Sequence, residues 1–175
     1  TPVFGLGEER EERRRTITER CEEAAQIVGR RDPAVIWVQY NSEGDLIERL
    51  VKDSVQVSGD DSDEAKEEKL TAFGTGQARV LVTKSKIAGF GMNWQHCARV
   101  VTFVTHSYEA YYQAVRRCWR FGQTKPVTVE IIQTDGERRV AENMARKSAQ
   151  ASDMFDSIIR WMKDAQSVVI ERGNL

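Results

Sequence analysis

Short apolar runs alternate with amphipathic, charged stretches along most of the chain. Runs of this length, rich in Val and Ile, are typical of parallel strands that are covered on both faces. The stretches between them carry apolar residues at the three- and four-residue spacing of helices. We therefore expect five strands, at residues 34–40, 54–57, 79–83, 99–104 and 127–133.

Helices are expected between these strands, and each has a recognisable start or end. Asn41 and Ser42 can cap a helix over 43–52, in which Leu46, Ile47 and Leu50 point inward. The other helices are expected at residues 8–30, 60–73, 107–121, 134–150 and 152–165. Strands that alternate with helices in this way predict an α/β fold with a mainly parallel sheet flanked by helices.

We divide the chain into an N-terminal charged helix or linker at 1–33, a main domain at 34–150 and a C-terminal helix packed on it at 151–175. The first segment has a narrow apolar stripe. It suits either a helix on the domain surface or the tail of a linker from upstream, which would make the chain part of a longer protein. The stripe consists of Ile17, Cys21, Ala24, Ala25 and Val28.

Composition limits the function classes. The 175 residues are 40% hydrophobic and 30% charged, as expected for a globular domain with its own core. The net charge of −1 excludes binding to nucleic acid by overall charge, so any such contact needs a local patch. The apolar runs are too short for a bilayer, and the start does not resemble a signal peptide. We expect no membrane partner and a cytoplasmic, or in a eukaryote nuclear, location.

The three cysteines are expected to be reduced, and no metal site is expected. None of them lies in a Cys-x-x-Cys spacing. A cluster could be drawn from His96, Cys97, His106 and Cys118, but its spacing matches no usual zinc pattern.

The helix expected at 107–121 carries an arginine stripe. At about 100° per residue, one face of about 100° holds four polar residues, namely Gln113, Arg116, Arg117 and Arg120. The opposite side is expected to face the core and holds Tyr111, Val115, Cys118 and Trp119. No acidic residue stands three or four positions from these arginines. The stripe is therefore either a solvated basic face or a site for an anion, since guanidinium groups match phosphate oxygens.

A glycine-containing loop is expected between the third and fourth strands. Gly89 and Gly91 permit close approach of a backbone or ligand, although a tight loop explains them equally well. The loop follows the carboxyl end of a parallel strand, which is where open α/β sheets bind ligands.

The segment from Gln113 to Gln123 resembles motif VI of superfamily 2 helicases, in the form used by the Swi/Snf-like branch of DNA translocases. The resemblance implies a RecA-like three-layer fold. It also implies that Arg117 and Arg120 reach across a cleft to ATP held by a partner lobe, with Gln113 at the same cleft. Arg116 departs from the pattern, because this branch usually has an acid there.

The glycine loop resembles motif V of the same branch, with Ala88 and Trp94 as departures. The resemblance places the following residues at the ATP cleft: Gly89, Gly91 and Asn93. It implies that three preceding residues contact the nucleic-acid backbone: Lys84, Ser85 and Lys86.

The sequence contains neither a P-loop nor an acidic Mg²⁺ box. The resemblance therefore implies that residues 34–150 are the second, C-terminal lobe of a helicase. An N-terminal RecA-like lobe, absent here, would hold ATP and Mg²⁺, and DNA would be the polymer, with RNA not excluded. This chain alone is expected to be inactive. Two alternatives stay open: a non-catalytic nucleic-acid-binding or interaction module, and a Rossmann-like enzyme that uses Gly89 and Gly91.

Overall fold

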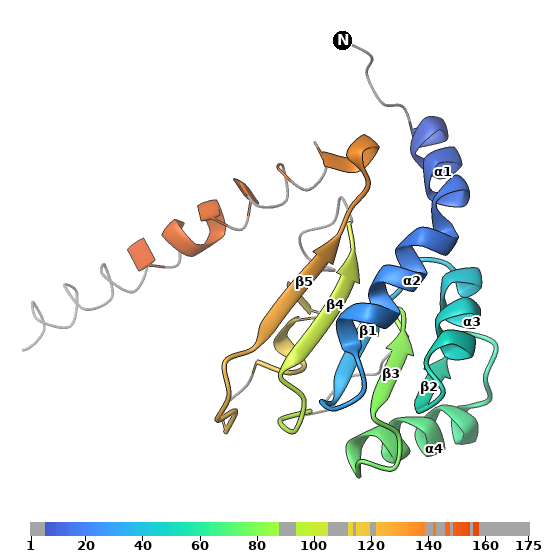
Figure 1. Ribbon diagram of the computed structural model, residues 1–175. Coiled ribbons are helices and arrows are strands. Elements are labelled where there is room, and N and C mark those ends of the chain that lie inside the picture. Colours follow the sequence, from blue (N-terminus) through green and yellow to red (C-terminus); the bar gives the residue numbers. More distant parts are fainter. Residues whose placement is uncertain are drawn as a thin grey trace, which may run out of the picture.

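A computed structural model describes three continuous segments, 6–87, 94–104 and 122–138, and shorter pieces at 112–113, 115–119, 142, 146–147, 149–154 and 156–157. Its centre is a five-stranded, fully parallel sheet in the order β2-β3-β1-β4-β5 (Figure 1). The strands are β1 (Ala34–Trp37), β2 (Ser54–Val57), β3 (Val80–Thr83), β4 (Arg99–Phe103) and β5 (Thr128–Ile132). The predicted α/β fold and all five strands are confirmed, with slightly shorter ends.

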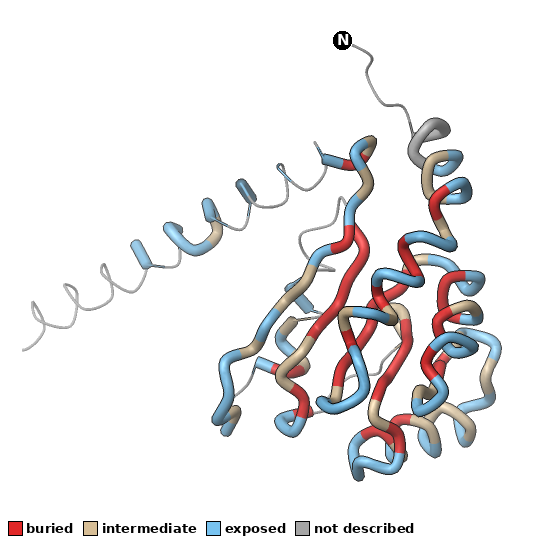
Figure 2. The backbone as a smooth tube through the Cα atoms, in the orientation of Figure 1, coloured by how far each residue is buried: buried red, intermediate tan, exposed pale blue. Residues whose placement is uncertain are grey.

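The sheet is covered on both faces, as its apolar runs predict. In β1, Ala34 and Ile36 belong to one core cluster, while Val35 and Trp37 belong to the other. Successive side chains of a strand point to opposite faces, so a wholly apolar run requires two covering layers. Figure 2 shows burial along β1, β3 and β4, with β5 more exposed at the edge.

Five helical elements are described in full. They are α1 (Leu6–Arg15), α2 (Ile17–Val28), α3 (Asn41–Leu50), α4 (Asp63–Gly74) and a 3₁₀ turn, η1 (Asp135–Glu137). Residues of α2 and α3 pack into one core cluster, and residues of α4 pack into the other, together with Cys118. Helices therefore flank the sheet on both sides and make the three-layer arrangement.

The N-terminal stretch forms two helices rather than one, with a turn at Thr16. The Thr16 hydroxyl donates to the carbonyl oxygen of Glu12 at 2.8 Å. In α2, Cys21, Ala24 and Val28 are buried in the core. The helix α2 is therefore a structural layer of the lobe.

Two details of α3 differ from the prediction. The helix begins at Asn41, so Asn41 and Ser42 lie inside its first turn. Leu50 is 43% exposed, because it stands in the last turn, where the helix leaves the sheet, whereas Ile47 is fully buried.

The C-terminal region is described in part. The predicted helix after β5 begins with η1, and the described residues between 142 and 157 are helical. Met154 is 64% exposed. The predicted packing of residues 151–175 falls mostly outside the described residues. Among the described residues, no helix is long and apolar enough to cross a membrane.

Candidate nucleotide and nucleic-acid site

The two segments predicted to carry function follow the carboxyl ends of β3 and β4, which lie on either side of β1. Trp37 of β1 is in register with Thr83 of β3 on one side and with Thr102 of β4 on the other. The chain therefore leaves β3 and β4 at about the same level, with β1 between them. In open parallel sheets this carboxyl edge is where ligands bind.

The three residues predicted to contact nucleic acid form a single turn after β3. The backbone N–H of Ile87 donates to the carbonyl oxygen of Lys84 at 3.0 Å and closes this turn. Lys84 and Ser85 are half-buried, and Lys86 is exposed. The structure thus brings a hydroxyl and two ammonium groups together on one short surface turn. The cleft residues Gly89, Gly91 and Asn93 lie outside the described residues.

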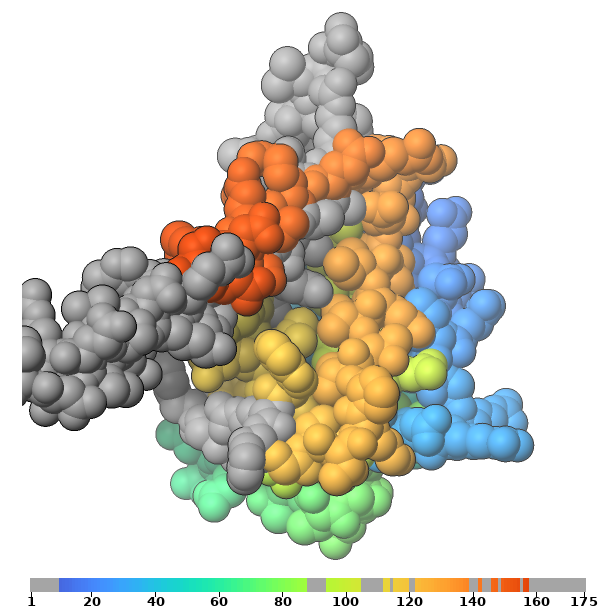
Figure 3. All heavy atoms as spheres, turned by 90° about the vertical axis from the view of Figure 1, so that its left-hand side faces the viewer, coloured from blue at the N-terminus to red at the C-terminus, as the bar shows by residue number. Residues whose placement is uncertain are grey.

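The arginine segment after β4 is helical at its described residues up to Arg116, and residues 117–119 form a turn. Tyr112, Gln113, Val115 and Arg116 have helical backbone. Gly122 has φ of +94°, a conformation common just after a helix. The helix nevertheless ends at Arg116, earlier than the predicted end at 121, because residues 117–119 form a turn. In the space-filling view, the described residues of this segment, in gold, lie beside the orange segment 122–138 (Figure 3).

The polar stripe faces outward at the positions that are described. Gln113 and Arg116 are exposed, and Arg117 is half-buried. The guanidinium carbon of Arg116 lies 5.4 Å from the ring centroid of Tyr112, within the range of a cation–π contact. Arg120, the second predicted finger, lies outside the described residues.

The prediction that Trp119 faces the core is wrong, because its side chain is 63% exposed. Cys118, on the same predicted face, is fully buried. The helix ends at Arg116, and the N–H groups of Cys118 and Trp119 both donate to the carbonyl oxygen of Val115, at 3.1 and 3.0 Å, in the turn that follows. A rotation of 100° per residue therefore no longer describes this turn.

Backbone contacts join the two functional segments. The N–H of Trp94, the first described residue after the glycine loop, donates to the carbonyl oxygen of Arg117 at 3.1 Å. The side-chain amide of Gln123 donates to the carbonyl oxygens of Cys97 and Cys118, each at 3.0 Å. We call these five residues the 94–123 junction. Gln123 was part of the motif in the sequence, but nothing there assigned it a contact.

The three cysteines are free, buried thiols. Cys97 and Cys118 are fully buried, and the Cys118 thiol hydrogen-bonds to Cys97. This bond lowers the pKa of Cys97 and raises that of Cys118, and burial opposes the thiolate of both. Burial, with the charge of Glu43, raises the pKa of Cys21 to about 12. Among the described residues, no group of three His, Cys, Asp or Glu side chains could hold a metal ion.

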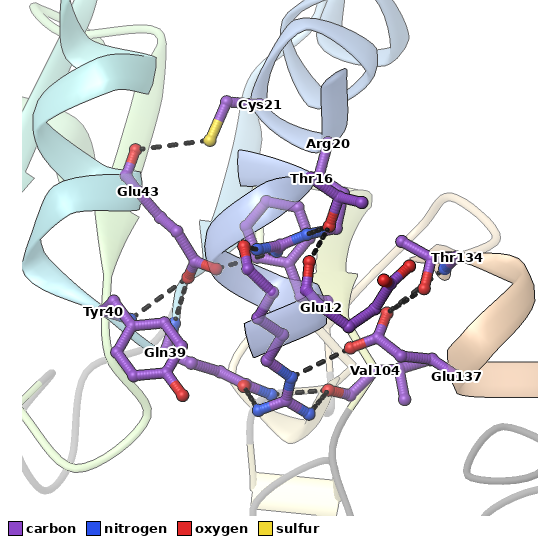
Figure 4. A network of polar contacts seen from close by, with 12 residues as sticks. Glu12, Thr16, Arg20, Cys21, Gln39, Tyr40, Glu43, Val104, Thr134 and Glu137 are labelled. Carbon is purple, nitrogen blue, oxygen red and sulfur yellow. Dashed lines mark hydrogen bonds and ion pairs between the residues drawn. The ribbon is translucent and has the colours of Figure 1, made fainter. Parts of the chain in front are cut away.

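A polar network ties α1 to the same carboxyl edge of the sheet (Figure 4). Arg13 donates to the Glu137 carboxylate at 2.9 Å, to the carbonyl oxygen of Val104 at 3.0 Å, and to Gln39. These partners follow β5, β4 and β1 respectively. Sequence reasoning missed this network, although Glu137 stands three residues after Thr134, the spacing of a capping box.

A hollow of about 900 Å³ lies at the opposite, amino edge of the sheet, away from both motifs. Arg79 lines it, pairs with Asp53 and donates to the carbonyl oxygens of Val28 and Gly29 at 3.1 and 2.8 Å. This arginine is occupied in closing the end of α2. The hollow therefore does not coincide with the candidate chemistry.

A fully parallel sheet in this order, with helices on both faces, defines a RecA-like α/β lobe. The family model described as "helicase conserved C-terminal domain" matches residues 18–122, which is more than half of the chain. The chain belongs to this family. A search of curated protein sequences found no match.

Solved structures share the fold at low sequence identity. The C-terminal part of the Fun30 ATPase domain has a TM-score of 0.58 and 18% identity, over 65% of this chain and 39% of that one. The C-terminal domain of the DEAD-box protein Dbp5 has a TM-score of 0.64 and 14% identity, over 76% of this chain and 80% of that one. The S. cerevisiae Dbp5 C-terminal domain, solved with Gle1 and IP6, has a TM-score of 0.63 and 13% identity. The match covers 76% of this chain and 80% of that one.

Proposed function

We propose that this chain is the second lobe of a nucleic-acid-dependent ATPase, a helicase or translocase most like the Swi/Snf branch. The observation that carries the proposal is the placement of the two motif segments. In a member of the helicase C-terminal family, the lysine turn follows β3 at the carboxyl edge of a parallel sheet. The arginine segment follows β4 and is bonded to the residues that lead out of the glycine loop.

On the nucleotide side, Arg117 and Arg120 act as arginine fingers on the γ-phosphate of ATP held by a first lobe. Gln113, Gly89, Gly91 and Asn93 complete this lobe's side of the cleft. ATP and Mg²⁺ are bound by the first lobe, and the arginines neutralise charge that develops as the phosphoryl group leaves. The exposure of Gln113 and the three-residue spacing of the arginines support this assignment.

On the nucleic-acid side, Lys84, Ser85 and Lys86 contact backbone phosphates. A hydroxyl and ammonium groups on one turn can bind phosphate without reading a base, so binding is expected to be independent of sequence. DNA is the proposed polymer, and the assay includes RNA for comparison.

The test uses the two-lobe protein and measures ATP hydrolysis with and without DNA or RNA. Arg117→Ala and Arg120→Ala should each lower kcat by about 10³–10⁵, with ATP affinity much less affected. Arg116→Ala, one position aside, is the matched control and should have a milder effect. Lys84→Ala with Lys86→Ala should weaken binding to all sequences alike and reduce its salt dependence. Unchanged kcat in both arginine variants would refute the proposal.

A second candidate is a non-catalytic binding module with the fold of a helicase lobe. The exposed rings of Trp119 and Tyr112 favour it, since aromatic residues are enriched at interfaces. The Dbp5 domain was solved with a protein partner, Gle1. The absence of nucleic-acid-stimulated hydrolysis in a two-lobe protein with an intact P-loop would favour this module.

A further inference from the structure

The side-chain amide of Gln123 satisfies two backbone carbonyls from separate segments. Its Nε2 donates to the carbonyl oxygens of Cys97 and Cys118, each at 3.0 Å, and its Oε1 accepts from the N–H of Lys125 at 3.1 Å. Both amide hydrogens are therefore used. The opposite orientation would place an oxygen against two carbonyl oxygens, so the partners dictate which way the amide points.

One carbonyl belongs to the arginine segment, and the other belongs to the residues that lead from the glycine loop to β4. Cys97 lies between the glycine loop and β4, and Cys118 follows Arg117 directly. The N–H of Trp94 donates to the carbonyl of Arg117 at 3.1 Å and makes a further link between the same segments. Trp94, Cys97 and Cys118 are 1%, 0% and 0% exposed, so this side of the junction is shielded from water, whereas Arg117 and Gln123 are half-buried. A polar group that loses its partner in such surroundings cannot readily turn to water.

Gly122 allows the chain to turn back so that Gln123 can reach Cys118. Its φ of +94° is strained for other residues, and an added Cβ would lie 2.6 Å from Nε2 of Gln95. The last carbonyls of a helix have no partner inside the helix. Gly122 and Gln123 together therefore end the arginine segment and attach its last turn to the residues that enter β4.

We propose that Gln123 is a positioning residue, which holds the arginine segment in a fixed place relative to the segment between the glycine loop and β4. The inference rests on the proposed function, because it assumes that Arg117 and Arg120 act on ATP. The bridge makes two segments move as one body, namely the arginine segment and the residues between the glycine loop and β4. Loss of the bridge therefore lowers the rate of hydrolysis and its stimulation by nucleic acid together.

The sheet does not depend on this bridge. The pairing of β4 with β5 begins at Arg99, and the N–H of Thr128 donates to the carbonyl of Ala98 at 2.8 Å. Gln123 itself is only half-buried. Its replacement should therefore leave the folded lobe intact and displace the arginines. A misplacement of about 1 Å can cost about 10²-fold in rate.

The experiment compares Gln123→Met with Gln77→Met in the two-lobe protein. Methionine keeps the approximate length of glutamine and removes its hydrogen bonds, and Gln77 is an exposed glutamine beyond α4. Gln123→Met should lower kcat by about tenfold or more, with the KM for ATP changed by less than about threefold. The ratio of stimulated to basal hydrolysis should also fall. Gln77→Met should match the wild-type protein in all three quantities.

The pH dependence of kcat in Gln123→Glu is a second test, because a purely structural role of Gln123 would not change it. A carboxylate facing two carbonyl oxygens is repelled, so its pKa is raised, and the protonated form can donate one hydrogen bond. The kcat of Gln123→Glu relative to wild type should therefore rise between about pH 8 and about pH 6. The corresponding ratio for Gln123→Met should stay constant over the same range.

The outcomes distinguish a failure of the proposed function from a failure of the positioning role of Gln123. If Arg117→Ala and Arg120→Ala leave kcat unchanged, the proposed function itself fails. If those variants are impaired but Gln123→Met behaves like Gln77→Met, the function stands and the positioning role is refuted. A change in KM alone, or unfolding of Gln123→Met in a thermal melt, likewise overturns the positioning role.

Discussion

Replacing Arg20 with Met should destabilise the lobe more than any exposed charge substitution. Arg20 and Glu43 form an ion pair of 2.7 Å, with side chains only 3% and 0% exposed. The guanidinium also donates to the hydroxyl of Thr16 at 3.1 Å and to the carbonyl oxygen of Arg13 at 2.7 Å, and it lies 4.7 Å from the ring centroid of Phe103. Figure 4 shows this arginine between α2 and the first turn of α3.

The size of the destabilisation depends on the contacts that Glu43 keeps after Arg20→Met. Removing one partner of a buried pair costs about 3–5 kcal/mol, because the other charge stays buried without compensation. Glu43 keeps two donors, the backbone N–H groups of Gln39 and Tyr40, at 2.9 and 3.1 Å. We therefore expect the lower end, about 3 kcal/mol. The second substitution, Glu43→Gln, should restore about 1–2 kcal/mol in the double variant, since it removes the unpaired charge.

Urea denaturation of the folded chain measures the effect. With an m-value of about 1–3 kcal/mol/M, a loss of about 3 kcal/mol lowers the midpoint by about 1–3 M. Arg15→Met is the matched control, because Arg15 pairs with Glu12 at 3.0 Å but is 68% exposed. It should cost less than about 1 kcal/mol. Equal midpoints for the two arginine variants would show that the Arg20–Glu43 pair does not stabilise the fold as argued.

Two further results are expected. Trp119→Ala should change the free energy of unfolding by less than about 0.5 kcal/mol, because the side chain is 63% exposed, and a loss of about 3 kcal/mol in a urea titration would contradict this exposure. Asp53→Asn should cost about 1 kcal/mol or less at pH 7, because Asp53 is half-exposed and solvent screens its pair with Arg79. The hydrogen bond from Arg79 lowers the pKa of Asp53 below 3.8, so this contribution is present above about pH 3.8 and is lost as pH falls through the lowered pKa. Wild type and variant should therefore converge in acid, and a difference that persists at about pH 2 would contradict the linkage.

Local patterns were sufficient for the elements of the fold. The wholly apolar run at Ala34–Trp37 requires a strand covered on both faces, and the structure gives both. Ser62 caps α4 by accepting from the N–H of Ala65, just before the acids that the sequence places at its start. The sequence places the end of the arginine segment at Gly122, and Gly122 has a positive φ in the structure. These features depend on residues within a few positions of each other, so spacing alone determines them.

Only the tertiary structure decided which distant segments meet. The order of strands puts β1 between β3 and β4, so the chain leaves β3 for the turn at Lys84 and leaves β4 for the arginine segment at the same edge of the sheet. The contact of Arg13 with Glu137 joins residues 124 positions apart. The exposure of Trp119 follows from the end of the helix at Arg116, which an ideal helix over 107–121 does not include. Gln123 likewise has two donor hydrogens in any sequence, but the carbonyls that receive them are brought within reach only by the folded sheet.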